Sequence, residues 1–146
     1  PGLGCSLAII PEAGLRRRFT QAMRGIVPHV NVLGLTAAEA AFTDAEAWRE
    51  ALIRTLRRNR DCVQDAVART PGLSMAPVEA TYLAWIDARG LKHADPARFF
   101  EEAGVGLSDG KDFGSFGWVR LNFGCSLPLL KSGLERMISA CSSLVG

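Results

Sequence analysis

Apolar and polar residues alternate through residues 117–124 (GWVRLNFG), which is the clearest strand pattern in the chain. Successive side chains of a strand point to opposite faces of a sheet. One face therefore carries Val119, Leu121 and Phe123, and the other carries Trp118, Arg120 and Asn122. We expect the apolar face to be buried, so that Arg120 is partly withdrawn from water beside a tryptophan.

Arg120 needs an anionic partner at such a position. A guanidinium does not lose its proton, and burying it costs free energy unless an anion and hydrogen bonds compensate. One candidate partner is Asp87, which falls on another predicted strand. The other is the carboxylate of a ligand, because the planar fork of arginine matches a carboxylate with two parallel hydrogen bonds. The residue pattern leaves both partners open.

Apolar residues at three- and four-residue spacing predict helices over 12–24, 36–42 and 44–69, and a last helix that begins near Pro128. The second helix opens with the spacing of a capping box. The third is the longest, and its apolar stripe consists of Trp48, Leu52, Leu56, Val63 and Val67. A short further helix is expected after Asp95-Pro96, a cap followed by proline.

Short apolar runs between turn residues predict strands over 5–10, 73–76, 80–88 and 105–107, in addition to the strand at 117–124. The run at 5–10 is nearly all apolar, which is typical of a strand buried on both faces of a parallel sheet. Residues 108–117 form a glycine-rich polar loop beside Arg120, and such loops often line binding sites. Strands that alternate with helices place the chain in the α/β or α+β class.

The composition is that of a folded protein, with 146 residues, 48% hydrophobic and 22% charged residues, and a formal net charge of +2. Arginine clusters at 16–18 and 54–60 lie on amphipathic helices without interleaved aromatic residues, so we expect no nucleic-acid partner. The cysteines are far apart and not near a histidine, which indicates reduced thiols in a cytoplasmic protein and no metal site. No apolar run approaches a membrane span, so we expect no membrane partner.

Two glycine motifs carry no function. Gly2-x-Gly4 begins like a dinucleotide fingerprint but lacks the third glycine and leads into a predicted strand rather than a helix, and Gly104-x-Gly106 differs in similar ways. No Ser-His-Asp or Cys-His arrangement has supporting local sequence, so nucleophilic catalysis within this chain is not expected.

A series of segments resembles one known family. The segments at 104–110 (GVGLSDG), 113–114 (FG) and 119–125 (VRLNFGC) are similar to the C-terminal signature of fold-type I pyridoxal-phosphate enzymes, and most similar to the cystathionine β-lyase-like C–S lyases that are classed with the aminotransferases. Upstream segments at 2–11, 28–41 and 80–87 (ATYLAWID) follow in the family's order. The resemblance covers essentially the whole chain.

The resemblance implies a role for Arg120. It matches the arginine that clamps the α-carboxylate of the amino-acid substrate, which would orient the substrate for removal of its α-proton. Asn122 shares the strand face of Arg120 and is expected either to support the guanidinium or to have a plain structural role. The loop around Ser108 to Phe113 is expected to lie near the substrate. The implied cofactor is pyridoxal 5′-phosphate.

The resemblance also implies that catalytic residues are missing here. The Schiff-base lysine of the family is expected upstream of Pro1, because Lys92, Lys111 and Lys131 lie in no matching segment. The cofactor contacts are expected upstream as well, and Gly4 takes the place of a phosphate-binding arginine of many aminotransferases, which favours the lyase branch. The chain alone is therefore expected to be inactive.

The implied architecture is the C-terminal portion of such an enzyme. Residues 1–43 would end the large cofactor-binding domain, 44–70 would form a long connecting helix, and 71–146 would form a small α+β domain with a mixed sheet packed with helices. The complete protein would be a homodimeric C–S lyase or aminotransferase. The alternative function is a non-catalytic module that keeps the carboxylate pocket.

Overall fold

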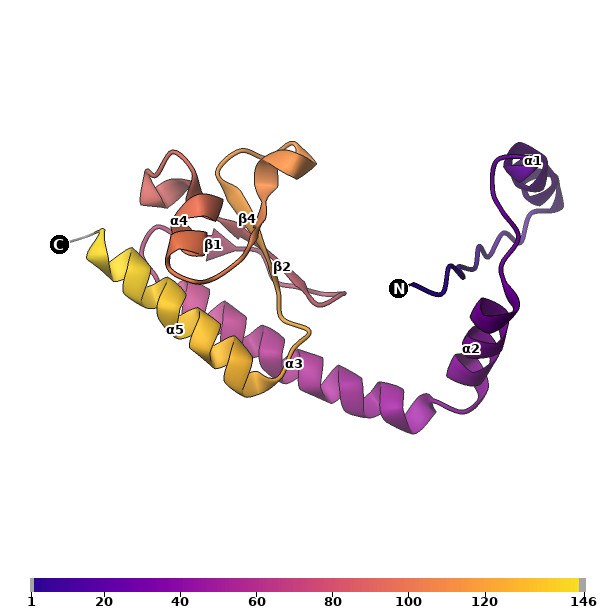
Figure 1. Ribbon diagram of the computed structural model, residues 1–146, viewed down its shortest axis with the longest axis horizontal. Helices are drawn as coiled ribbons and strands as arrows, with labels where there is room; N and C mark the ends of the chain where they lie inside the picture. Colours follow the sequence, from indigo (N-terminus) through magenta and orange to yellow (C-terminus); the bar gives the residue numbers. More distant parts are fainter. Residues whose placement is uncertain (1, 145–146) are drawn as a thin grey trace. The chain divides into compact units, whose positions relative to one another are not determined.

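The computed structural model describes residues 2–144 and confirms the α/β class. By their contacts the residues form two units, Pro1–Glu50 and Ala51–Gly146, and the division falls within helix α3 (Glu46–Ala68). Figure 1 shows the elements of each unit in the order of the sequence. The finer division into 1–43, 44–70 and 71–146 stays a prediction.

The first unit holds two helices and little core. Helix α1 (Ala13–Met23) begins after Glu12, whose carboxylate accepts the backbone N–H of Gly14 at 2.6 Å and also that of Leu15. Helix α2 spans Val32–Thr43. Among residues 2–50, Gly34 alone is buried, so this unit contributes almost no hydrophobic core of its own.

Two expectations for the first unit are wrong. Residues 5–10 form no strand, because no strand within residues 2–144 pairs with them, and Ile9 is 91% exposed. Helix α2 begins four residues before the predicted capping box, because the side chain of Asn31 caps it by accepting the backbone N–H of Gly34 at 2.8 Å.

The second unit is built on an antiparallel sheet. Its strands are β1 (Ser74–Met75), β2 (Leu83–Asp87), β3 (Ser108–Asp109) and β4 (Trp118–Asn122), and their spatial order is β1-β2-β4-β3. Every pairing of these strands is antiparallel, so the sheet formed by the described residues is not the mixed sheet expected. The edge strand β3 lies at 108–109 rather than at the predicted 105–107.

The second unit also contains helices α4 (Pro96–Glu102) and α5 (Leu127–Ser143) and two short 3-10 turns, η1 (Arg89–Leu91) and η2 (Gly110–Phe113). Helix α4 begins as predicted at Asp95-Pro96, and the Asp95 carboxylate accepts the backbone N–H of Arg98 at 3.0 Å. The expected loop at 108–117 thus contains β3 and η2.

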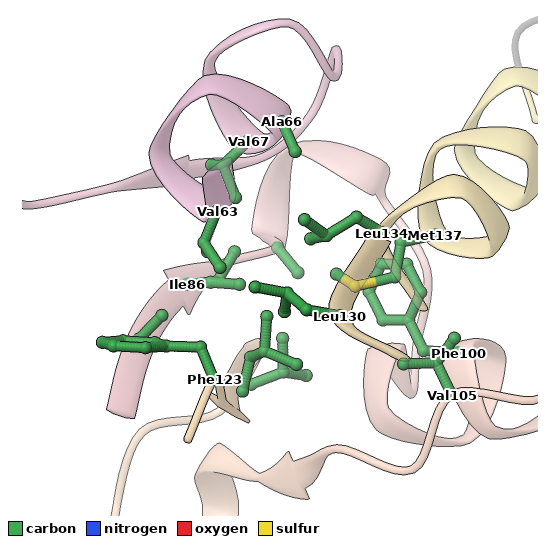
Figure 2. Packing of buried hydrophobic residues seen from close by; sticks show 14 of the residues in the cluster. Val63, Ala66, Val67, Ile86, Phe100, Val105, Phe123, Leu130, Leu134 and Met137 are labelled. Atoms are coloured by element: carbon green, nitrogen blue, oxygen red, sulfur yellow. The ribbon is translucent and has the colours of Figure 1, made fainter. Parts of the chain in front are cut away.

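The core lies between one face of the sheet and helices α3 and α5. Figure 2 shows Val63 of α3, Ile86 of β2 and Leu130 of α5 pointing into one cluster. Each fully buried aliphatic side chain of this size stabilises the fold by roughly 1.5–3 kcal/mol. The predicted stripe of α3 is confirmed at Val63 and Val67, but Trp48 is 67% exposed.

Strand β4 divides its side chains as its sequence predicts. Val119, Leu121 and the following Phe123 are buried in the core, while Trp118 and Arg120 are half-buried on the opposite face. An antiparallel sheet can leave one face open in this way. That open face carries the candidate site.

Candidate functional site

Arg120 lies at the centre of a row of three residues that crosses the open face. Trp85 of β2 is directly opposite Arg120 on one side, and Ser108 of β3 is directly opposite on the other. Residues directly opposite in antiparallel strands have Cβ atoms about 4.5–5.5 Å apart, so their side chains can interact. The sheet therefore places an indole, a guanidinium and a hydroxyl side by side.

Two contacts hold the guanidinium of Arg120. Its Nη2 donates a hydrogen bond to the Ser108 hydroxyl oxygen at 3.2 Å. Its Cζ lies 4.4 Å from the centre of the Phe113 ring. Among residues 2–144, Arg120 has no carboxylate partner within ion-pair distance. A half-buried cation is therefore left with free N–H donors and no anion of its own within this part of the chain.

Asp87, the structural partner considered from the sequence, does not pair with Arg120. It lies opposite Trp118 in the sheet, and its carboxylate binds Arg89, which donates from Nε at 2.9 Å and from Nη2 at 2.7 Å. These hydrogen bonds lower the pKa of the Asp87 carboxyl below its ordinary value. The hypothesis of an Arg120–Asp87 pair is therefore wrong, because a nearer arginine occupies the carboxylate.

An aromatic cluster lies beside Arg120 on the open face, and its member Phe113 contacts the guanidinium. Trp85 and Trp118 stack with their ring centres 5.8 Å apart and an interplanar angle of 17°. Phe113 meets Trp85 edge to face at 5.7 Å and 87°. These rings exclude water from part of the open face, and they offer Arg120 no hydrogen-bond acceptor. Exclusion of water lowers the local dielectric constant and so strengthens the attraction between a guanidinium and a carboxylate.

Two glycines allow the loop that carries Phe113 to fold against β4. A Cβ at Gly110 would stand 2.3 Å from the Ser115 carbonyl oxygen and 2.5 Å from that of Trp118. At Gly117 the backbone has a φ of +79°, and a Cβ would stand 2.5 Å from Cγ of Arg89. Glycine at 110 therefore lets the turn η2 approach β4 closely, and glycine at 117 leaves room for the Arg89 side chain.

Asn122 has another partner than the one expected from the sequence. Its side-chain oxygen accepts the backbone N–H of Gly124 at 2.8 Å, in a local turn after β4. The structure thus brings Ser108 and Arg120 into contact, and it places Asn122 on the same face without a hydrogen bond to the guanidinium. A role for Asn122 or Ser108 in substrate binding stays a prediction.

The three lysines lie in different surroundings. The Lys111 ammonium lies 2.6 Å from the Asp109 carboxylate, which raises the pKa of Lys111, and a bound ammonium is a poor nucleophile. Lys92 ends the turn η1 and Lys131 lies on α5, both exposed. A Schiff-base lysine upstream of Pro1 stays a prediction, whereas the surroundings of Arg120 fit a carboxylate.

One positioning residue was missed from the sequence. Asn59 of α3 is fully buried, and its amide nitrogen donates to the carbonyl oxygens of Phe123 at 2.9 Å and Cys125 at 2.8 Å. It thereby fixes the chain just beyond the strand that carries Arg120. The sequence does indicate a buried polar side chain here, because Asn59 lies three residues after Leu56 and four before Val63, on the apolar stripe of the helix.

Two of the relatives found by sequence comparison are both named cystathionine β-lyase. No family model matches the chain. It is 33% identical over 148 residues to the cystathionine β-lyase PatB of Bacillus subtilis, a match that covers 97% of this chain and 38% of PatB. It is 37% identical over 113 residues to the cystathionine β-lyase of Corynebacterium glutamicum, covering 75% of this chain and 30% of that protein.

Solved structures give the same result. The structure of OvoB matches with a TM-score of 0.91 and 51% identity, over 97% of this chain and 38% of OvoB. Cystalysin from Treponema denticola, which contains pyridoxal 5′-phosphate, matches with a TM-score of 0.79 and 28% identity, over 93% and 36%. The chain thus spans less than two-fifths of the length of these relatives. None of the helices within residues 2–144 is long and apolar enough to cross a membrane.

Proposed function

We propose that this chain, whose homologues are pyridoxal-phosphate-dependent fold-type I proteins of the cystathionine β-lyase and aminotransferase type, is the C-terminal part of a C–S lyase. In the complete protein, Arg120 binds the α-carboxylate of an amino-acid substrate. An aminotransferase activity is the nearest alternative, since proteins of both names share this fold.

The observation that carries the proposal is the unpaired state of Arg120 within residues 2–144. Its guanidinium is half-buried, is held by Ser108 and Phe113, and has no carboxylate partner in this part of the chain. A half-buried guanidinium is costly unless an anion reaches it. A substrate carboxylate supplies that anion and takes two parallel hydrogen bonds from the free edge of the fork.

The contribution of this chain to the reaction is orientation. Pyridoxal phosphate, when bound, serves as the electron sink for a carbanion at the substrate α-carbon. A carboxylate fixed on Arg120 limits rotation of the substrate, so that its α-hydrogen keeps one direction. The aromatic rings beside Arg120 keep water from competing for the guanidinium. For a cysteine-like substrate, loss of the α-proton and of the β-thiol gives free 2-aminoacrylate, and hydrolysis of this product by one water yields pyruvate and ammonia.

We propose that the lysine and phosphate contacts of the cofactor belong to a segment outside residues 2–144. The short coverage of the relatives supports this proposal. The nearly coreless unit of residues 2–50, with exposed Leu7, Ile9 and Phe42, supports it too, because a chain this apolar normally buries such side chains against further structure. The complete protein is further proposed to be a homodimer located in the cytoplasm. Light scattering of the purified protein would test the dimer, and cell fractionation would test the location.

The test is an assay of the complete protein, obtained from the reading frame that includes the codons upstream of Pro1. Formation of pyruvate from cystathionine without a keto acid supports the lyase, and amino transfer to a keto acid supports the aminotransferase. Arg120→Ala should lower kcat/KM about a hundred-fold or more, since it removes a charged, bidentate contact. Lack of an upstream lysine segment and of either activity would support the non-catalytic module instead.

A further inference from the structure

We propose that Phe113 is a positioning residue for Arg120, and that its ring sets the plane in which the guanidinium presents its N–H groups to a carboxylate. The inference rests on the proposed function of Arg120 and adds a specific residue from a different element, the turn η2. Phe113 contacts the guanidinium, so the proposed role is exerted through Arg120.

The contact geometry supports this role. The Arg120 Cζ lies 4.4 Å from the centre of the Phe113 ring, which is the distance of a cation held over an aromatic ring. The ring occupies one side of the guanidinium, and Ser108 accepts from Nη2. These two contacts act at different positions, so together they restrict both the tilt and the rotation of the planar group. Its remaining N–H donors are left for a planar carboxylate.

Phe113 is itself held in place by two further contacts. Its ring meets Trp85 edge to face at 5.7 Å, and Trp85 lies directly opposite Arg120 in the sheet. The backbone of the turn is fixed by the Ser115 N–H, which donates to the Gly110 carbonyl oxygen at 2.9 Å. Phe113 is therefore linked to β2 through Trp85 and to β4 through Arg120, and Arg120 is linked to β3 through Ser108.

Hydrophobic burial does not explain a phenylalanine at this position. Phe113 is 51% exposed and does not belong to the core cluster of the sheet and helices. A large aromatic ring half in water and in contact with a half-buried cation is better explained by that cation. The same loop offers a control, because Phe116 is 78% exposed and has neither ring nor cation contact within residues 2–144.

The first experiment measures the contact in the complete protein by nuclear magnetic resonance. A ring current shifts the Arg120 Nε–H signal upfield when the guanidinium lies over the ring. Phe113→Leu should remove this shift, Phe113→Tyr should keep it, and Phe116→Leu should leave it unchanged. An Arg120 signal that is equal in wild type and Phe113→Leu would overturn the proposal, whatever the function of the protein.

The second experiment compares two ligands in the complete holoenzyme, L-alanine with its carboxylate and ethylamine without one. Phe113→Leu should weaken L-alanine binding about five-fold and leave ethylamine binding unchanged, whereas Phe113→Tyr should keep the wild-type preference. Phe116→Leu serves again as the control.

The variant Arg120→Lys distinguishes carboxylate binding by Arg120, which is the proposed function, from positioning of Arg120 by Phe113. It should reduce the preference for L-alanine about ten-fold or more, since lysine lacks the planar fork. If Arg120→Lys has no effect, the proposed function is contradicted. If Arg120→Lys reduces the preference and Phe113→Leu does not, the role of Phe113 is contradicted and the carboxylate clamp stands.

Discussion

The side-chain amide of Asn59 in α3 donates a hydrogen bond to the carbonyl oxygen of Phe123, at 2.9 Å, across 64 residues of sequence. Both residues are buried, and the same amide also binds the Cys125 carbonyl oxygen. The exit of β4 is thus tied to the long helix. Removal of this amide leaves two carbonyl oxygens without their donor.

We therefore predict that Asn59→Ala lowers the free energy of unfolding by about 1–3 kcal/mol, since the buried Phe123 carbonyl loses its side-chain donor and an unsatisfied buried carbonyl costs roughly that much. Urea unfolding of the 146-residue chain measures this. Arg58→Ala is the control, because Arg58 is the exposed neighbour in the same helix and should change the free energy by less than about 0.5 kcal/mol. Equal effects of the two variants would contradict the anchoring role of Asn59.

The second prediction concerns the partners of Asp87. In double-mutant cycles, Asp87→Asn and Arg89→Leu should couple by about 0.2–1 kcal/mol, because the two side chains form an ion pair at 2.7 Å whose arginine is largely exposed. Asp87→Asn and Arg120→Leu should show coupling near zero. A coupling between Asp87 and Arg120 as large as that of the Arg89 pair would mean that Arg120 has a structural partner.

The third prediction follows from the lowered pKa of Asp87, which is caused by its hydrogen bonds from Arg89. A carboxyl with a lowered pKa in the folded state adds stability above its ordinary pKa of 3.8, and this stability is lost as the pH falls through the lower folded value. When the pH is lowered from about 5 to 2, the free energy of unfolding should thus decrease less in Asp87→Asn than in wild type. The difference between the two decreases should be no more than about 1 kcal/mol.

The control for this pH dependence is Asp109, whose pKa is lowered by Lys111 through a separate pair. Asp109→Asn should reduce the acid sensitivity independently of Asp87→Asn, so that the double variant shows the sum of the two effects. If the free energy of unfolding changes with pH in the same way in wild type and Asp87→Asn, the assigned Asp87–Arg89 pair is contradicted.

The fourth prediction concerns the unequal cores of the two units. Backbone amides of β2 and β4 should be the most protected from hydrogen exchange, because their strands lie on the buried cluster. Amides of α1 and α2 should exchange far faster in the 146-residue chain, since Gly34 alone is buried among residues 2–50. Equal protection of α2 and β4 would show that residues 2–50 form a stable core by themselves.

Local patterns predicted much of the second unit. The alternation through 117–124 assigned both faces of β4, and Asp95-Pro96 located the start of α4. These features depend on residues close in sequence. The site's partners could not be predicted in this way, because strand register brings Trp85 and Ser108 beside Arg120 from 35 and 12 positions away.

The errors have physical causes as well. The run at 5–10 is apolar enough for a buried strand, but a strand needs neighbours, and none pairs with it among the described residues. Helix α2 begins before the expected range 36–42 because the Asn31 side chain caps it at an earlier position. Asp87 does not pair with Arg120 because Arg89, two residues along the same segment, occupies its carboxylate.

The most direct test is a crystal structure of the complete protein with a bound amino acid. We predict that both carboxylate oxygens accept hydrogen bonds from Arg120, at about 2.7–2.9 Å, with the guanidinium still over the Phe113 ring. An amino-acid carboxylate bound elsewhere, or Arg120 paired with an acidic side chain from another part of the protein, would contradict it.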